Sequence, residues 1–161
     1  MTLTLLDALT LVSAIGAGVI AGTFFAFSTS VMAALGRLPA PQGIAAMQAI
    51  DIVIINAWFM TPFLGTALLG VAIAVMAVAR WSAASPYLLA GAVLYVVGTF
   101  LVTMLFNVPR NNALAAVTPT TTEAAHLWAR YLVSWTFWNH VRTVAALAAM
   151  VSFVVAFRLG A

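Results

Sequence analysis

The chain has 161 residues, of which 65% are hydrophobic and only 6% are charged, and its mean hydropathy is +1.16. These residues cannot supply the polar surface that a protein needs in water, so we expect an integral membrane protein. Its net charge of +3 comes from arginines alone, which in a chain of this hydropathy favours contact with lipid headgroups and excludes a nucleic-acid partner.

The predicted elements are four long helices. The apolar runs reach or exceed the roughly 20 residues that a helix needs to cross the hydrocarbon core, and they show no period-2 alternation. Together with the polar turns between them, they predict helices over about residues 3–35, 43–79, 86–107 and 123–158. The expected fold class is all-α: an integral membrane, antiparallel four-helix bundle formed by a single domain over residues 1–161.

The first of these helices is expected to stay in the protein rather than to act as a removable signal peptide. Asp7 is its only early charge, and no basic stretch precedes its apolar residues. A helix over residues 3–35 would be roughly 50 Å long against about 30 Å of hydrocarbon. Because the polar residues of the helices gather toward the end opposite the termini, we expect the helices to extend beyond the bilayer on that side.

An even number of spans places both termini on one side of the membrane, together with the turn at residues 80–86. Arg80 and Arg158 flank that side, and Arg37 and Arg110 lie on the other, so a simple count gives a tie. As anchors at helix ends, Arg80 and Arg158 favour a cytoplasmic location for both termini, in the cytoplasmic membrane.

One face of the fourth helix carries a concentrated polar and aromatic pattern. Its members follow the spacing i, i+3, i+7, i+11, i+14 of one continuous helical face: Trp128, Tyr131, Trp135, Asn139 and Arg142. His140 lies about 100° away from Asn139 around the same helix. Because an arginine within the membrane costs roughly 2.5–3.5 kcal/mol, this face should turn into the bundle.

Polar residues on the second and third helices are placed to meet this face. Gln48 and Asp51 share a face beside Asn56, and the third helix repeats a polar side chain every four residues, at Tyr95, Thr99, Thr103 and Asn107. These stripes predict an interior pocket whose functional candidates are Arg142, Asn139, His140 and Asp51. The alternative left open is a purely structural ion pair between Arg142 and Asp51.

The histidine and cysteine counts limit metal chemistry. The chain has no cysteine, and its only histidines, His126 and His140, are fourteen residues apart on one predicted helix, which separates them by roughly 21 Å. They cannot share a metal ion within one chain. No metal site is predicted, although a haem held by a single histidine stays open. The sequence also lacks a glycine-rich phosphate loop and a nucleotide fingerprint.

Two motifs stand out in the second half of the chain: NVPRNNAL at residues 107–114 and WARYLVSWTFWNHVRT at residues 128–143. With the segment over residues 21–60, they resemble the anthrone oxygenase-like family, small four-helix membrane proteins mostly known as a domain of unknown function. The chain departs from the family's pattern at two positions. An apolar residue is more usual where Arg110 stands, and an asparagine where Asp51 stands.

The resemblance implies an oxygenase that converts an anthrone to an anthraquinone with O₂ and without an added cofactor. Such a site needs a base, and His140 is preferred over Asp51 because an imidazole exchanges its proton near neutral pH. Donors to the enolate oxygen are expected from Arg142, Asn139, Asn107, Asn111 and Asn112. Further substrate contacts are expected from Asn56 and from the aromatic side chains Trp128, Tyr131, Trp135 and Phe24.

Two other interpretations stay open. In the first, the same pocket binds a quinone or another lipid-like metabolite without a reaction, in a carrier, a sensor or an accessory subunit. In the second, the polar residues only lock the bundle together in an assembly component. The expected partners are a hydrophobic aromatic or quinone-like small molecule and the lipid bilayer, and a homo-oligomer is left open.

Overall fold

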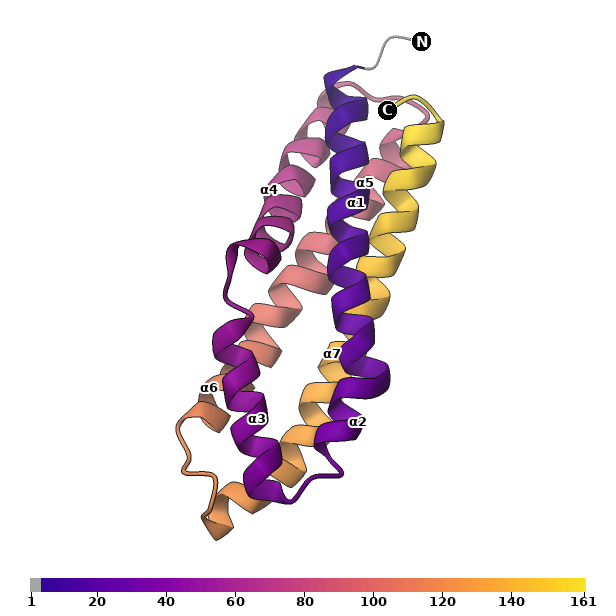
Figure 1. The fold of residues 1–161 in the computed structure, drawn as a ribbon. Coiled ribbons are helices and arrows are strands. Elements are labelled where there is room, and N and C mark those ends of the chain that lie inside the picture. The colour runs from indigo at the N-terminus through magenta and orange to yellow at the C-terminus, as the bar shows by residue number, and fades with distance from the viewer. Residues whose placement is uncertain (1–3) are drawn as a thin grey trace.

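The structure is a computed structural model that describes residues 4–161, and every regular element in that range is helical (Figure 1). The first membrane helix comprises α1 (Leu5–Ala26), a π-helical turn η1 (Phe27–Val31) and α2 (Met32–Leu35). α1 begins in a capping box, in which Thr4 Oγ1 accepts from the Asp7 N–H at 3.0 Å and the Asp7 carboxylate accepts from the Thr4 N–H at 2.9 Å. The predicted start at residue 3 lies outside the described residues.

The second predicted helix is broken into two. The sequence predicts one helix over residues 43–79, but the structure has α3 (Ala40–Val53) and α4 (Ala57–Ala79). Asn56 explains the break, because its side chain accepts from the Phe59 N–H at 3.2 Å and donates to the Val53 carbonyl at 2.7 Å. An asparagine in this position serves the first donors of a new helix and the last acceptors of the preceding one. The prediction of a continuous helix is therefore wrong.

The third membrane helix is continuous over Ser85–Ala115 but changes its winding. It comprises α5 (Ser85–Val93), two π-helical segments η2 (Leu94–Leu101) and η3 (Thr103–Asn107), and α6 (Val108–Ala115). The predicted end at residue 107 is wrong, because Pro109 falls in the first turn of α6, where its missing N–H is tolerated. Asn111 and Asn112 consequently lie in a helix and not in the predicted loop.

The fourth helix, α7 (Thr122–Arg158), agrees with the prediction for residues 123–158. Thr121 caps its start by accepting from the Ala124 N–H at 3.2 Å. The start of α1 and the end of α7 lie at the same end of the bundle (Figure 1), where Thr4 Oγ1 donates to the Ala161 carbonyl at 3.4 Å. The predicted all-α membrane bundle is confirmed.

Four helical segments are long and apolar enough to cross a membrane: Leu5–Leu35, Ala57–Ala79, Ser85–Ala115 and Thr122–Arg158. Two exposed tryptophans bracket α4, with Trp58 (91% exposed) near its start and Trp81 (68% exposed) just after its end. Tryptophans concentrate at membrane interfaces, and the length of α4, roughly 34 Å, matches a hydrocarbon core of about 30 Å. We infer that the bilayer surrounds α4, and that α3, α6 and the first half of α7 extend beyond it.

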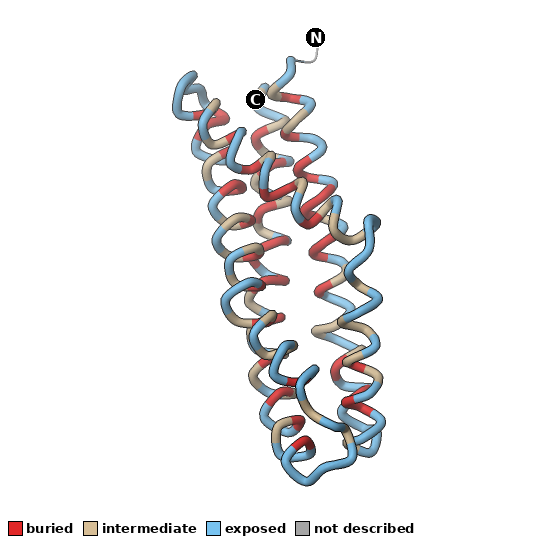
Figure 2. The backbone as a smooth tube through the Cα atoms, turned by 90° about the vertical axis from the view of Figure 1, so that its left-hand side faces the viewer, coloured by how far each residue is buried: buried red, intermediate tan, exposed pale blue. Residues whose placement is uncertain are grey.

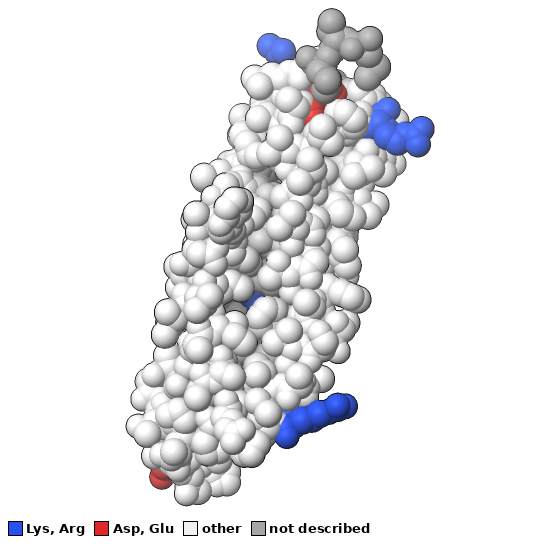
Figure 3. All heavy atoms as spheres, in the orientation of Figure 1, with Lys and Arg blue, Asp and Glu red and all other residues white. Residues whose placement is uncertain are grey.

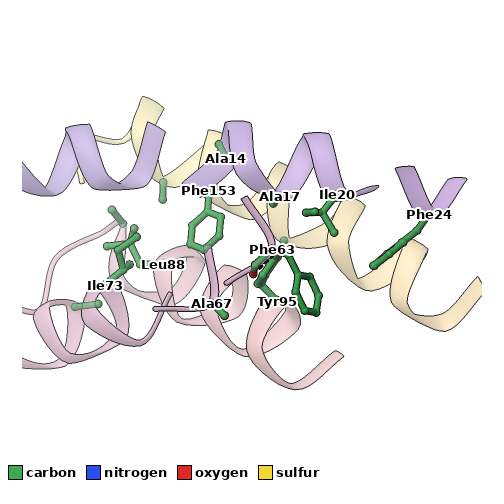
Figure 4. Close-up of a cluster of buried hydrophobic side chains, with 14 residues drawn as sticks. Ala14, Ala17, Ile20, Phe24, Phe63, Ala67, Ile73, Leu88, Tyr95 and Phe153 are labelled. Atoms are coloured by element: carbon green, nitrogen blue, oxygen red, sulfur yellow. Dashed lines mark hydrogen bonds between the residues drawn. The ribbon is translucent and has the colours of Figure 1, made fainter. Parts of the chain in front are cut away.

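Two apolar cores hold the bundle together, and buried residues line the inward sides of the helices throughout (Figure 2). The core in the α4 half includes Ile20, Phe63 and Phe153 (Figure 4). The helices approach closely there, since a Cβ atom on Gly91 would lie 2.7 Å from the Phe153 ring. The core in the other half surrounds Trp128 and includes Met32, Leu35, Ile44 and Met47.

Candidate functional site

A buried arginine lies at the junction of the two cores. Arg142, on α7, is only 5% exposed, and its guanidinium carbon lies 3.8 Å from the ring centroid of Phe24 and 4.8 Å from that of Trp135. Asn139 Oδ1 accepts from Nε at 3.0 Å and from Nη2 at 2.8 Å, and Thr103 Oγ1 accepts from Nη1 at 3.3 Å. Across residues 4–161, aromatic rings and neutral oxygens hold this guanidinium, and not an ion pair with Asp51.

Asn139 fixes the arginine and ties α7 to the first membrane helix. Its Nδ2 donates to the Phe24 carbonyl at 2.8 Å and to Ser28 Oγ at 2.7 Å. The backbone carbonyl of Asn139 accepts from Thr143 Oγ1 at 2.6 Å. Ser28 lies in the π-helical turn η1, and such turns often occur at functional sites. The sequence gives no signal for this turn, so Ser28 and Thr143 are not among the predicted site residues.

A second polar cluster surrounds Asn111 on α6. Asn111 Oδ1 accepts from Tyr131 Oη at 2.9 Å and from Trp135 Nε1 at 2.6 Å, and its Nδ2 donates to Asp51 Oδ1 at 2.9 Å. Asn107, one turn earlier, donates to the Trp135 carbonyl at 3.2 Å. Trp135 therefore connects the two clusters, because its indole is held by Asn111 and its ring faces Arg142.

Asp51 is the acidic member of this second cluster. It lies on α3, outside the membrane-spanning segments. Among residues 4–161, only its Oδ1 is hydrogen-bonded, whereas Oδ2 is buried without a partner. Burial raises the pKa of the Asp51 carboxyl to about 6, although the nearby charge of Arg142 acts in the opposite direction. On the same helix, Gln48 Nε2 donates to the carbonyls of Leu114 at 2.9 Å and Val117 at 3.1 Å, which anchors α3 beside α6.

The aromatic face predicted on the fourth helix forms a continuous inner stack. The Trp128 and Tyr131 rings lie 5.5 Å apart at 17°, and those of Tyr131 and Trp135 lie 6.0 Å apart at 22°. All three side chains are buried. The helix thus turns this face, with Asn139 and Arg142, toward the interior, as the spacing predicts.

Three predicted site residues lie apart from this interior arrangement. His140 is exposed on the outside of α7, because it follows Asn139 by about 100° around the helix. Asn112 is exposed for the same reason on α6, next to the inward-facing Asn111. Asn56 is exposed too, and its side chain caps α4 instead of reaching Arg142.

An apolar groove opens on the outer surface at the break between α3 and α4. Its volume is about 550 Å³, and its walls include Val19 and Thr23 of α1, Ala49 and Val53 of α3, and Trp58 and Phe59 of α4. Asn56 also lines it. Figure 3 shows an opening midway along this face with a basic side chain visible at its floor.

Substituting Asn111 by alanine is expected to destabilise the half of the bundle around α3. The change leaves the buried Tyr131 hydroxyl and Trp135 indole N–H without their acceptor, and each unsatisfied group costs about 1–3 kcal/mol. A lower thermal midpoint of the purified protein, followed by circular dichroism, would show this loss. Asn112→Ala is the matched control, because this neighbouring side chain is exposed. Equal thermal midpoints for the two variants would show that the hydrogen bonds of Asn111 to Tyr131 and Trp135 do not stabilise the bundle.

The fold and this site define a class: small four-helix membrane proteins with a polar and aromatic cluster enclosed between their helices. The family model described as anthrone oxygenase matches residues 55–152, more than half of the chain. The chain therefore belongs to the anthrone oxygenase family, which confirms the resemblance. The curated proteins contain no match to the chain, and neither do the solved structures. The matched region includes Asn111, Trp135 and Arg142, whereas Phe24 and Asp51 precede it.

Proposed function

We propose that the protein is a membrane-embedded oxygenase that converts a flat, hydrophobic anthrone to the corresponding anthraquinone with O₂ and without an added cofactor. In addition to family membership, one observation on the structure supports this proposal. Arg142 is a buried cation with neutral partners, set against two aromatic rings, and its charge acts on the Asp51 carboxyl, whose Oδ2 has no partner among residues 4–161. Such an arrangement suits a ligand that is aromatic, apolar and negatively charged during the reaction.

Asp51 takes the role of the base in this proposal. The hydrogen of the saturated ring carbon of an anthrone is acidic, because its removal gives an aromatic enolate. Asp51 Oδ2 is the oxygen without a partner, and a pKa of about 6 leaves the carboxyl largely ionised at neutral pH yet basic enough to accept a proton. His140 is exposed on the outer surface of α7 and is not the base proposed here.

Arg142 stabilises the enolate oxygen in this proposal. A guanidinium has five N–H donors, and three of those of Arg142 bond Asn139 and Thr103. The remaining two are available to an oxyanion. A preorganised donor in a site that excludes water stabilises developing charge far more than water does.

The enolate then reacts with O₂. It transfers one electron to O₂, and the resulting carbon radical and superoxide combine to form a carbon–oxygen bond. The proton that Asp51 accepted passes to the outer oxygen of the resulting peroxide. Loss of the second hydrogen of the same carbon, as a proton, then breaks the oxygen–oxygen bond and leaves a carbonyl group, while the outer oxygen departs as hydroxide and forms water with that proton. The sum is anthrone plus O₂ to anthraquinone plus water, with the substrate oxidised by four electrons and O₂ reduced by four.

Purified protein in nanodiscs tests this function with an unsubstituted anthrone and ¹⁸O₂. We expect quinone absorbance to rise faster than the spontaneous rate, with one ¹⁸O atom in each anthraquinone and the other in water. Protein unfolded by heat is the control for adventitious catalysis. Turnover at the spontaneous rate, accompanied by tight binding of anthraquinone, would replace the oxygenase with a quinone-binding protein.

A further inference from the structure

The apolar groove at the helix break continues along the seam between α1 and α4. A second groove of about 510 Å³ adjoins it and shares Val19. Its walls include Val12 and Ile15 of α1 and Pro62 and Gly65 of α4. The two grooves therefore form one apolar furrow, which runs from the membrane-spanning part of the bundle to the break.

The position of the furrow exposes it to molecules dissolved in the bilayer. α4 is the helix that we place within the hydrocarbon, and Trp58 at its start marks the interface. The groove at the break thus lies where the hydrocarbon core gives way to the headgroups. A flat apolar molecule can move from lipid into such a groove without crossing water.

Two aromatic rings line the way from the groove to the buried arginine. Phe59 forms part of the groove wall, and its ring centroid lies 6.2 Å from that of Phe24. The Phe24 ring lies in turn 3.8 Å from the Arg142 guanidinium carbon. Phe59 is half-buried, and passage along this route requires its ring to move away from that of Phe24.

We propose that the groove at the α3–α4 break is the access site for the substrate, which passes from the bilayer between Phe24 and Phe59 to Arg142. This inference rests on the proposed function for the identity of the occupant, a flat aromatic ketone. The aromatic walls formed by Trp58 and Phe59 suit such a ring system. This groove differs from the rest of the lipid-facing surface because its wall residue Phe59 lies against Phe24, which in turn lies against the Arg142 guanidinium.

The absence of cysteine from the sequence allows a direct test. Ala49 lines the groove, and Ala45 lies one turn earlier on α3, exposed but outside the groove lining. In nanodiscs, anthraquinone should slow the reaction of a polar maleimide with the Ala49→Cys variant at least fivefold and leave the Ala45→Cys variant unchanged. Equal rates with and without anthraquinone would overturn the inference. So would equal protection by hexadecane, because the groove would then hold any acyl chain.

A second measurement separates this inference from the proposed reaction. After complete labelling of the Ala49→Cys variant with a bulky maleimide, kcat/KM for the anthrone should fall at least tenfold, whereas the labelled Ala45→Cys variant should match its unlabelled form. Unchanged turnover after labelling would reject the access route while leaving the oxygenase intact. Protection by anthraquinone without any turnover would reject the oxygenase while leaving the groove as a binding site.

Discussion

Substituting Arg142 by methionine is expected to lower kcat for anthrone oxidation by about 10²–10³-fold, the loss that follows removal of one oxyanion donor. Methionine keeps an unbranched side chain that fills much of the same space, but it has neither the positive charge nor any N–H donor. Asn139 Oδ1 loses both of its hydrogen bonds in this variant, and a buried acceptor without a partner costs about 1–3 kcal/mol. We therefore expect a lower thermal midpoint together with slower formation of quinone absorbance.

Two further variants sharpen this test. Arg110→Met is the matched control, because Arg110 is half-buried and, within the described part of the chain, its side chain bonds only Ser134 and the Phe106 carbonyl. We expect it to keep the parent kcat. Arg142→Lys keeps a positive charge but lacks the planar guanidinium with its fixed N–H donors, so its activity should lie between that of Arg142→Met and that of the parent. An Arg142→Met protein with the parent kcat would show that no oxyanion forms against this residue.

Substituting Asp51 by asparagine is expected to lower kcat by about 10²–10⁴-fold, the usual contribution of a positioned base. Asparagine has nearly the same volume, and its Oδ1 can still accept from Asn111 Nδ2, so the bundle should stay folded. Steady-state kinetics with the purified variant, after its fold has been checked by circular dichroism, measure the effect.

The pH profile gives the same assignment an independent readout. Burial raises the pKa of Asp51 to about 6, and the base acts in its deprotonated form, so kcat/KM should fall as the pH drops through about 6. Asp51→Asn should lack this limb of the profile. His140→Ala is the control, because its exposed ring is expected to leave both kcat and the profile unchanged. Loss of turnover in His140→Ala with full activity in Asp51→Asn would reverse the two roles.

The helices could be predicted because hydrophobic runs of membrane-spanning length leave few other structures open to the backbone. The break at Asn56 could not, since the apolar pattern continues on both sides of it and only the cap geometry stops α3. The helical position of Asn111 could not be predicted either. A proline two residues earlier suggests a loop in the sequence, yet its position in the first turn of α6 lets the helix continue.

The inner face of α7 could be predicted from its spacing alone, and that spacing already sets His140 apart from Asn139. What surrounds Arg142 could not be predicted, because its partners come from distant parts of the chain. Phe24 belongs to α1 and Thr103 to η3. Sequence alone suggests Asp51 as the partner of Arg142 on grounds of charge, whereas packing gives it two rings and two neutral oxygens.

The π-helical winding of η2 and η3 also determines how the chain tolerates insertions and deletions. A π-helical segment corresponds to an α-helix that has gained a residue within a turn. Deleting one residue between Leu94 and Leu101 would let one of these turns rewind as an ordinary α-helical turn, so the residues after it would keep nearly the same facing. Asn107 and Asn111 would then stay turned toward Trp135. The same deletion in α7 before Asn139 would instead rotate Asn139 and Arg142 by about 100° away from the interior. The third membrane helix can therefore lose a residue with less damage to the site than α7 can.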